Sequence, residues 1–367
     1  MILKHLSITN YRNLVVANLD FSPNVNCLVG ANGMGKSNVL DAIYYLSFCR
    51  GFASAQDAQN LNHNSDFFIL EGDYELESEA EQHICCSLQR GARKRLKVDG
   101  KDVKKLSEHV GRIPLVMIAP ADSALMIGGS EERRRFMDTV IMQYRASYLD
   151  ALIRYDKALK QRNALLKQEE EPDAAVLDVI EEMMAVSGEL IYSERKQFVE
   201  EFEPIFMDLY RRLSGQDAEV VTMNYESHGS RGDLRPQLKD WRSKECIVGY
   251  SLHGIHKDEL VLLLNGYPVK REASQGQQKT YFIAMKLAQY VFLKNKGEQK
   301  VPLLLLDDIF DKLDAQRVER IVDYVSGNDF GQIFITDTRR EHLDQVLAST
   351  KRHYRLFSVV NGNVLPQ

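Results

Sequence analysis

The stretch Val25-Asn-Cys-Leu-Val-Gly30-Ala-Asn-Gly-Met-Gly-Lys36-Ser37, followed by Asn38-Val-Leu-Asp-Ala-Ile-Tyr-Tyr-Leu-Ser-Phe, decides the fold. Its first five residues suit a short buried strand, and after Asn38 apolar residues recur every three to four positions, as in a helix. A glycine-rich segment that ends in Lys-Ser between a strand and a helix is typical of a phosphate-binding loop. The sequence therefore predicts an ATP site at Gly30 to Ser37.

The residues expected to bind ATP are those of this loop: Gly30, Ala31, Asn32, Gly33, Met34, Gly35, Lys36 and Ser37. The glycines let successive backbone N–H groups converge on the phosphates, and the start of the following helix adds partial positive charge. Lys36 would act in catalysis by reaching the β- and γ-phosphates, and the Ser37 hydroxyl would bind Mg²⁺. The alternative is a chance glycine-rich turn, which the flanking strand and helix disfavour.

A second part of the predicted site follows the apolar stretch Val301-Pro-Leu-Leu-Leu-Leu, which ends in Asp307 and Asp308. Paired acids at the tip of a buried strand suit magnesium chemistry. Asp307 would hold the ion, directly or through water, and Asp308 would act as the general base that polarises the attacking water. A charged pair that only caps a core strand is the alternative.

Upstream of these acids, Ser274-Gln-Gly276-Gln opens an amphipathic helix. Taken alone, it indicates no more than a helix N-cap by Ser274. Its position about 30 residues before the acidic strand matches ATP-binding cassette proteins, in which the serine and helix start of one subunit clamp the γ-phosphate held by the other. Ser274 and Gly276 therefore predict an ATP-gated homodimer.

Further segments are candidates for nucleotide contact. Phe310-Asp-Lys-Leu-Asp314 stands where the cassette class has its D-loop, and Thr336 with Asp337 ends a strand where that class senses the γ-phosphate. The turn Asn10-Tyr-Arg-Asn13 is another candidate, although a surface arginine in a turn would look the same. No glutamine of a Q-loop is clear, and Asp122 is the substitute.

Composition and charge narrow the class of protein. No apolar run approaches the roughly 20 residues that span a bilayer, and no signal peptide is recognisable, so we expect a cytoplasmic protein without membrane contact. Five cysteines without C-x-x-C spacing argue against a disulfide framework and a zinc site. With a net charge of −5, contact with DNA would depend on local basic clusters, and Arg93 to Lys105 and Arg133 to Arg135 are the candidates.

The middle of the chain has a helical texture. Tyr148 to Lys167 and Ala174 to Leu213 show helical periodicity with few breakers and would form an antiparallel pair. We therefore predict that residues 113–245 form an inserted, mainly helical lobe.

The two ends of the chain have strand character. Residues 1–112 suggest strands and turns around the loop helix, and strand patterns return at Ile247 to Leu252 and at Glu259 to Leu264. The expected fold class is α/β: an ABC-type P-loop ATPase lobe, built from residues 1–112 and 246–367, which carries the helical lobe.

Together, these motifs resemble the RecF family of bacterial recombination and repair ATPases, which is related to the Rad50 and SMC proteins. The Asn10 turn, the phosphate loop, the Ser274 segment and Asp307-Asp308 occur in the family's order. Gly128-Gly-Ser-Glu-Glu-Arg133-Arg134-Arg-Phe-Met-Asp138 resembles the family's middle motif, and Gly254-Ile-His-Lys-Asp-Glu259 is near its Gly-Pro-His-Arg-Asp-Asp. The resemblance covers nearly the whole chain.

The resemblance implies a protein that binds ATP and Mg²⁺, dimerises on ATP and binds DNA at gaps and at junctions of single strand and duplex. It further implies slow, DNA-stimulated ATP hydrolysis, action with RecR and RecO, and assistance to RecA loading and SOS induction. Two alternative hypotheses remain open. The protein could be an ABC-type transport ATPase subunit, or an ATP-switched bridging protein that does not hydrolyse ATP.

Overall fold

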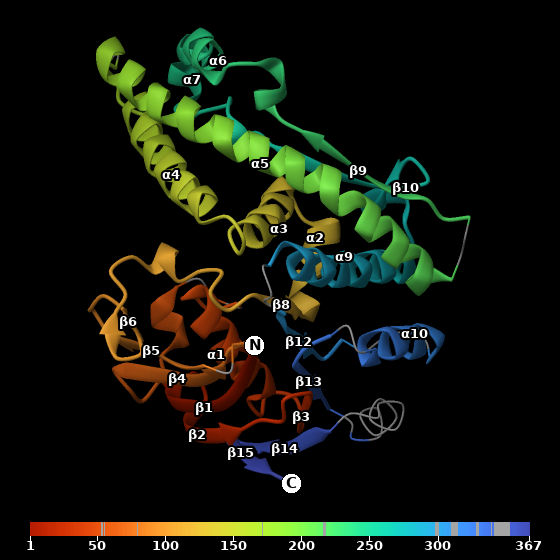
Figure 1. Ribbon diagram of the computed structural model, residues 1–367. Coiled ribbons are helices and arrows are strands. Elements are labelled where there is room, and N and C mark those ends of the chain that lie inside the picture. Colours follow the sequence, from red (N-terminus) through yellow and green to blue (C-terminus); the bar gives the residue numbers. More distant parts are fainter. Residues whose placement is uncertain are drawn as a thin grey trace. The chain divides into compact units, whose positions relative to one another are not determined.

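The computed structural model divides into two compact units (Figure 1). The first comprises Met1–Ser123, Arg212–Gly215 and Lys279–Gln367, and the second comprises Ala124–Arg211 and Gln216–Gln278. The structure describes residues 1–52, 54, 56–78, 80–170, 172–215, 218–297, 301–309, 315–327, 330–338, 340 and 353–367.

Two six-stranded sheets form the framework of the first unit. One is antiparallel, in the order β2-β1-β4-β5-β6-β7. The other has the order β15-β14-β3-β13-β12-β8 and is parallel apart from its edge strand β15. The strands are β1 (Ile2–Tyr11), β2 (Leu14–Asp20), β3 (Val25–Val29), β4 (Phe67–Glu75), β5 (Glu81–Gln89), β6 (Arg95–Val98), β7 (Lys101–Asp102), β8 (Leu115–Ile118), β12 (Leu303–Asp307), β13 (Ile333–Asp337), β14 (Tyr354–Val360) and β15 (Asn363–Pro366).

Helix α1 (Lys36–Phe48) contacts strands of both sheets. Because both sides of the helix are covered, it is buried almost all round rather than on one face, with Val39, Leu40, Ile43 and Leu46 fully inaccessible. The predicted unit of strand, glycine-rich loop and helix is confirmed, and its β3 lies within the parallel sheet. Helices α9 (Gln275–Lys296) and α10 (Ala315–Ser326) also belong to this unit, although α9 begins in the second.

The parallel register brings distant residues to one edge of the sheet. In the ladders, Val29 pairs with Asp337, and Thr336 pairs with Asp307. Ligand sites in open parallel sheets lie at the carboxyl ends of the strands. The phosphate loop and the acidic strand tip therefore share that edge, as the motif order predicts.

The second unit contains the predicted antiparallel pair, α4 (Ala146–Leu166) and α5 (Ala174–Ser214), although the last residues of α5 belong to the first unit. A small antiparallel sheet in the order β11-β10-β9 accompanies them. The remaining elements are α2 (Ala124–Ile127), α3 (Ser130–Ile141), β9 (Val221–Glu226), α6 (Leu234–Asp240), α7 (Arg242–Val248), β10 (Glu259–Leu264), β11 (Tyr267–Pro268) and α8 (Val269–Glu272).

The strand predicted at Ile247 to Leu252 is wrong, because α7 occupies its first residues and a loop the rest. Gly249 adopts the left-handed conformation that ends α7 and donates its N–H to the Glu245 carbonyl. The backbone N–H groups of Leu252 and His253 then donate to the Glu245 carboxylate. Side-chain acceptors thus replace the neighbouring strand that a sheet would have supplied. The strand predicted at Glu259 to Leu264 is confirmed as β10.

The boundaries of the units also differ from the predicted ones. β8 lies in the first unit because it pairs with β12, whereas the prediction began the helical lobe at residue 113. β10 pairs with β9, so residues 246–278 fall in the second unit.

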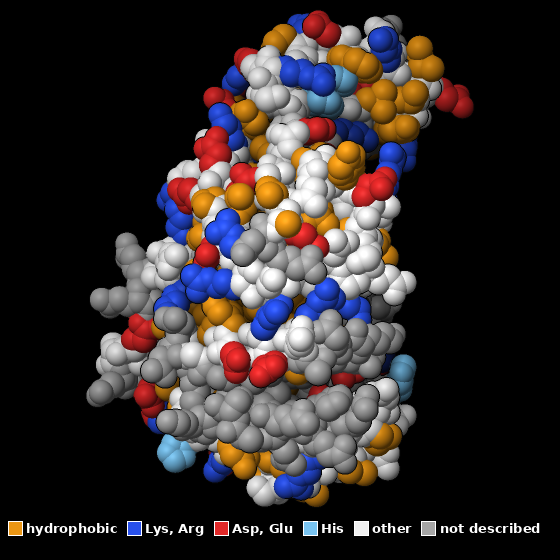
Figure 2. Space-filling model, turned by 90° about the vertical axis from the view of Figure 1, so that its right-hand side faces the viewer, with side chains coloured by type: hydrophobic (Ala, Val, Ile, Leu, Met, Phe, Trp, Pro, Cys, Tyr) orange, Lys and Arg blue, Asp and Glu red, His pale blue; other side chains and the backbone are white. Residues whose placement is uncertain are grey.

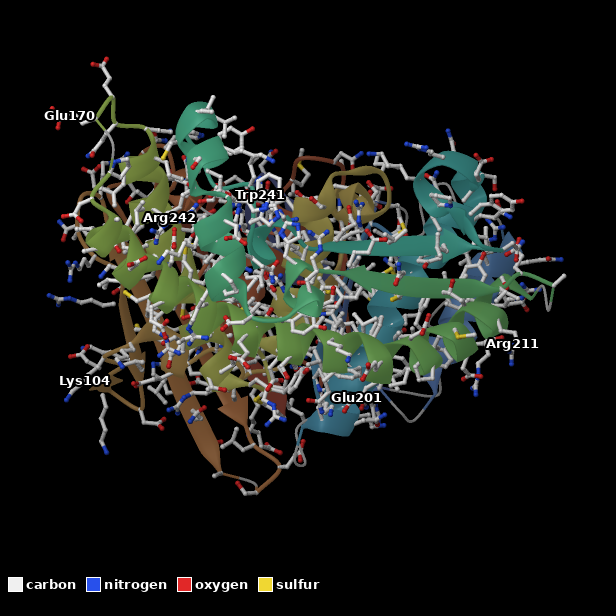
Figure 3. All side chains as sticks on the ribbon, turned by 90° about the horizontal axis from the view of Figure 1, so that it is seen from above. Lys104, Glu170, Glu201, Arg211, Trp241 and Arg242 are labelled. Carbon is white, nitrogen blue, oxygen red and sulfur yellow. The ribbon has the colours of Figure 1, made fainter. Side chains whose placement is uncertain are left out.

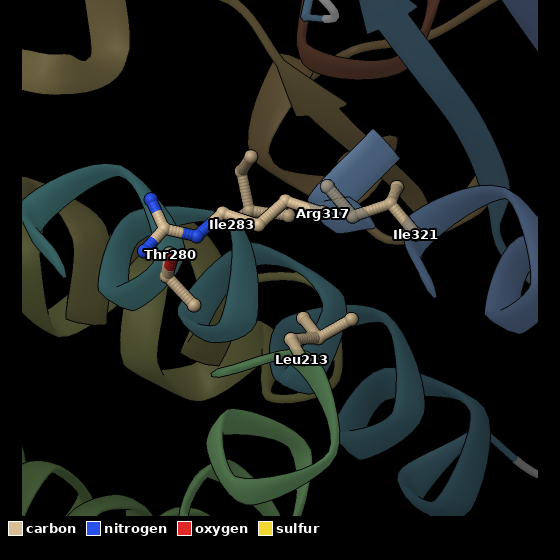
Figure 4. A pocket seen from close by; sticks show the side chains of 5 residues that line it. All are labelled: Leu213, Thr280, Ile283, Arg317 and Ile321. Carbon is tan, nitrogen blue, oxygen red and sulfur yellow. The ribbon is translucent and has the colours of Figure 1, made fainter. Parts of the chain in front are cut away.

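A shallow recess of about 200 Å³, partly open to solvent, lies in the first unit (Figure 4). It contains none of the predicted site residues, being lined by Leu213, Thr280, Ile283, Arg317 and Ile321. Within the part of the chain that the structure describes, no helix combines the length and the apolar character needed to cross a membrane.

Candidate nucleotide-binding site

The phosphate loop depends on two of its glycines. Gly35 directly precedes α1 with φ 116°, and a Cβ there would lie 2.8 Å from Asn13 Oδ1. At Gly30, a Cβ would lie 2.2 Å from the Val359 carbonyl oxygen. The N-cap of α1 is Gly35, and within the described residues it has no side-chain cap hydrogen bond. The helix start can therefore offer N–H groups and partial positive charge to an anion.

Lys36 lies over the loop. Its side chain is buried, and Nζ donates to the Gly30 and Ala31 carbonyls at 2.7 and 3.0 Å. Burial lowers the pKa of Lys36, and three nearby carboxylates oppose that shift, those of Asp308, Asp307 and Asp337. The ammonium group thus lies between the loop and the acidic end of the sheet, where it could interact with phosphate.

Ser37 and Asp307 meet although 270 positions separate them in the sequence. Ser37 Oγ donates to Asp307 Oδ1 at 2.8 Å, and the Thr336 hydroxyl donates to the same oxygen at 2.7 Å. Thr336 is fully buried on β13, between β3 and β12. Thr336 therefore orients Asp307, a role that the sequence did not indicate. The sensing of the γ-phosphate by Thr336 and Asp337 stays a prediction, with a plain strand end as its alternative.

Asp308 follows the strand tip in the left-handed conformation, with φ 49°. Its N–H bonds the Thr336 hydroxyl at 3.0 Å and the Thr336 carbonyl at 3.3 Å. These bonds hold a backbone conformation that is uncommon for a residue other than glycine. The side chain is half-buried, in contrast to buried Asp307.

The residues present fit a magnesium ion that is shared with phosphates. A hydroxyl and a carboxylate are hard oxygen ligands, and adjacent ligands of an octahedral Mg²⁺, bound at about 2.1 Å, lie about 3 Å apart. The 2.8 Å between Ser37 Oγ and Asp307 Oδ1 agrees with that spacing. No group of three or more acidic, histidine or cysteine side chains suited to a metal occurs among the described residues, so the other ligands would come from phosphate and water.

Of the predicted Asn10 to Asn13 turn, Asn13 reaches the loop and Arg12 is engaged elsewhere. Asn13 Nδ2 donates to the Gly33 carbonyl at 3.3 Å. The Arg12 guanidinium pairs with Asp41 of α1 at 2.8 Å. The ion pair of Arg12 thus links the turn to α1. Asn13 is the residue of this turn that contacts the phosphate loop.

Ser274 and Gly276 lie in the second unit. Ser274 Oγ accepts from Gln277 N–H at 3.2 Å, and Gln277 Oε1 accepts from Ser274 N–H at 2.8 Å. This reciprocal pair is a capping box, so the ordinary N-cap function considered for Ser274 is present. Ser274 is also exposed, which leaves the start of α9 accessible to a second subunit.

Asp122 lies in the short 3₁₀ helix after β8 and pairs with Lys286 of α9 at 3.0 Å. The pair joins the segment predicted to replace the Q-loop to the helix that Ser274 caps. The predicted D-loop, Phe310 to Asp314, lies outside the described residues.

The two family-like motifs of the second unit are joined by three arginines, of which Arg195 is buried and Arg133 and Arg134 are half-buried. Arg133 binds Glu259 through two bonds, at 2.6 and 2.7 Å, and Arg134 donates to the Asp258 carbonyl. Fully buried Arg195 pairs with both Asp138 and Asp258. The suggestion that Arg133 and Arg134 contact DNA phosphate is therefore replaced by a structural role. Sequence alone gave no signal for Arg195.

Comparisons with known proteins agree with this geometry. The chain matches the family model described as RecF/RecN/SMC N terminal domain over residues 2–364. The DNA replication and repair protein RecF of Phocaeicola vulgatus is 54% identical over 364 residues, 99% of this chain and 98% of that protein. Its namesake from Porphyromonas gingivalis is 47% identical over 365 residues, which cover 99% and 100% of the two chains.

Solved structures show the same relationship. The recombination mediator protein RecF-ATPrS of the RecFOR pathway is 27% identical, with a TM-score of 0.89 over 99% of this chain and 97% of that one. The Smc head domain of Pyrococcus furiosus shares the fold at 16% identity, with a TM-score of 0.58 over 100% and 96% of the chains. With its phosphate loop, acidic strand tip and full-length relatives, this chain belongs to the RecF family.

Proposed function

We propose that this protein is an ATPase of DNA replication and repair, and that its ATP site is completed by a second copy of the chain. The observation that carries the proposal is the contact of Ser37 with Asp307 at the edge of the parallel sheet. It unites the two halves of a nucleotide site. The solved relatives whose names include RecF-ATP and RecF-ATPrS support ATP as the nucleotide.

Each residue of the site has a proposed role. The N–H groups of residues 30–37 hold the phosphates, and Lys36 exchanges its two loop carbonyls for oxygens of the β- and γ-phosphates. Ser37 and Asp307 hold Mg²⁺, which when bound would neutralise charge on the transferring phosphoryl group. Asp308 accepts a proton from the attacking water.

The second subunit supplies the remaining groups. Its Ser274 and Gly276, at the start of α9, close over the γ-phosphate, so hydrolysis depends on dimerisation. A single subunit then hydrolyses ATP slowly. In the dimer, the time that passes before ATP is hydrolysed sets how long the protein stays bound to DNA.

The proposed site of action is DNA at gaps and at junctions of single strand and duplex, in concert with RecR and RecO and in support of RecA loading and SOS induction. The RecF relatives and the solved structures from the RecFOR pathway support this assignment. No described feature favours a transport subunit.

The test is steady-state ATP hydrolysis across protein concentrations, with and without gapped duplex DNA. We expect a rate that rises faster than linearly with protein concentration and that increases with DNA. A rate that is linear in protein and indifferent to DNA would refute the DNA-responsive dimer.

A further inference from the structure

The antiparallel sheet of the first unit ends in a strongly basic segment. Residues 93–105, which contain β6 and β7 and are called the basic hairpin below, hold seven basic and two acidic residues. Their net charge is thus +5, in a protein whose net charge is −5. Positive charge is therefore concentrated at this edge of the sheet.

Most of these cations have no carboxylate partner. Within the described residues, six exposed side chains of the basic hairpin form no ion pair: Arg93, Arg95, Lys97, Lys101, Lys104 and Lys105. Figure 3 shows Lys104 at the outer margin of the ribbon. In Figure 2, by contrast, basic and acidic side chains are interspersed over the upper part of the surface. Other lysines of the chain do have carboxylate partners: Lys160, for example, lies 2.6 Å from Asp156.

The pairing of the strands aligns part of this charge. Arg95 and Lys97 lie opposite Ser87 and Cys85, and both point to the exposed face, whereas Leu96 between them is buried. Alternate residues of a strand are about 6.6 Å apart along it. The two cations thus form a row on β6, next to the edge strand β7, and the chain after β7 runs back beside β6, since the Val103 N–H donates to the Leu96 carbonyl.

Lys94 differs from the others and anchors the basic hairpin. Its Nζ lies 2.9 Å from an Asp57 carboxylate oxygen and donates to the Cys49 carbonyl. Cys49 is the C-cap of α1, the helix that begins at Lys36 in the phosphate loop. The basic hairpin is therefore fixed to the far end of the nucleotide-binding helix.

Lysines on an edge strand also prevent sheets from pairing edge to edge. That function explains Lys101 on the edge strand β7, whereas Lys97 lies on β6, which pairs with β5 and with β7. Arg93, Lys104 and Lys105 lie outside the strands. Contact with nucleic-acid phosphates requires cations that are held in place and are not neutralised by carboxylates of the protein. The cations of the basic hairpin meet both conditions.

We propose that the basic hairpin is a contact surface for the phosphates of DNA, and that Lys94 connects bound DNA to α1. This inference rests on the proposed function, since it presupposes that the protein binds DNA. The contacts are to the backbone, so they add affinity without reading base sequence.

The test uses full-length protein with ATP, Mg²⁺ and a labelled gapped duplex, whose binding is followed by fluorescence anisotropy at several salt concentrations. The variant combines Arg95→Ala, Lys97→Ala and Lys101→Ala. The control combines Lys160→Ala, Lys196→Ala and Lys239→Ala. It removes the same charge from side chains that are 75%, 56% and 64% exposed and have carboxylate neighbours.

Log affinity falls as log salt concentration rises, and each lost phosphate contact makes this negative slope shallower by about 0.9. The slope of the hairpin variant should therefore be shallower by roughly 2.7, and this variant should bind DNA at least about tenfold more weakly. The control should keep the slope of the unmodified protein. Stimulation of ATP hydrolysis by DNA should fall in the hairpin variant alone. Equal melting temperatures would show that all three proteins are folded.

Two results would overturn the proposal, and they are distinguishable. If the unmodified protein binds DNA and the hairpin variant keeps its salt slope, the inference fails and the proposed function stands. Increased self-association of that variant with an unchanged slope would identify the cations as protection of the sheet edge. If the unmodified protein does not bind DNA at any salt concentration, the proposed function itself fails.

Discussion

Replacing Thr336 by valine tests whether the buried hydroxyl organises the acidic end of the site. Valine keeps the shape of the side chain but removes the donor to Asp307 Oδ1 and the acceptor for the N–H of Asp308. A hydrogen bond to a charged group contributes about 1.5–3 kcal/mol, and the Asp308 N–H retains its bond to the Thr336 carbonyl. We expect a loss of about 2 kcal/mol in the free energy of unfolding.

For a unit of this size, that loss corresponds to a fall in melting temperature of roughly 4–8 °C, measured by circular dichroism. Thr9→Val, on the partly exposed face of β1, is the matched control and should change stability by less than about 0.5 kcal/mol. Ser37→Ala removes the second donor to the same oxygen, so the double variant should lose more than the sum of the single losses, by about 1 kcal/mol. A Thr336→Val protein that melts with the unmodified chain, or strict additivity, would refute this reasoning.

Two further predictions concern pH and the phosphate loop. Burial lowers the pKa of His253 and of His256 to about 4, so the stability contributed by their neutral rings is complete above about pH 6.5 and is lost as the pH falls toward 4. Urea unfolding can be followed by the fluorescence of the single tryptophan, Trp241, which stacks on His253. The urea midpoint should be lower at pH 5 than at pH 7, and this difference should be smaller in His253→Phe. An unchanged difference in that variant would contradict the assignment to His253. Gly30→Ala would place a Cβ 2.2 Å from the Val359 carbonyl oxygen, so the backbone must shift, and ATP affinity measured by calorimetry should fall at least about tenfold; affinity equal to that of the unmodified chain would show that the loop tolerates the change.

The elements around the nucleotide loop could be predicted because their signals are local. The run from Val25 to Ser37 contains its own strand, turn and helix start, and the structure has each of them. The contact of Ser37 with Asp307 could be expected from the order of the motifs, since parallel strands end at a common edge.

Other features depend on partners that are distant in the sequence, and local patterns do not reveal those. Arg133 suggested a phosphate contact, but its partner Glu259 is 126 positions away. The pattern from Ile247 to Leu252 suggested a strand, but the backbone N–H groups of Leu252 and His253 donate to the Glu245 carboxylate rather than to a neighbouring strand. Thr336 can orient Asp307 because β13 lies between β3 and β12 in the parallel sheet, and this order of strands is not visible in the local sequence.

The most direct test of the composite site is complementation between two inactive variants. Lys36→Ala removes the phosphate-binding lysine and leaves Ser274 intact, and Ser274→Arg does the reverse. Each variant alone should lack ATP hydrolysis. When they are mixed in equal amounts, half of the dimers pair one variant with the other, and each of these has one complete site, so about a quarter of the unmodified rate should return. A mixture as inactive as its components, with mixed dimers present in mass measurements, would contradict a site shared between two subunits.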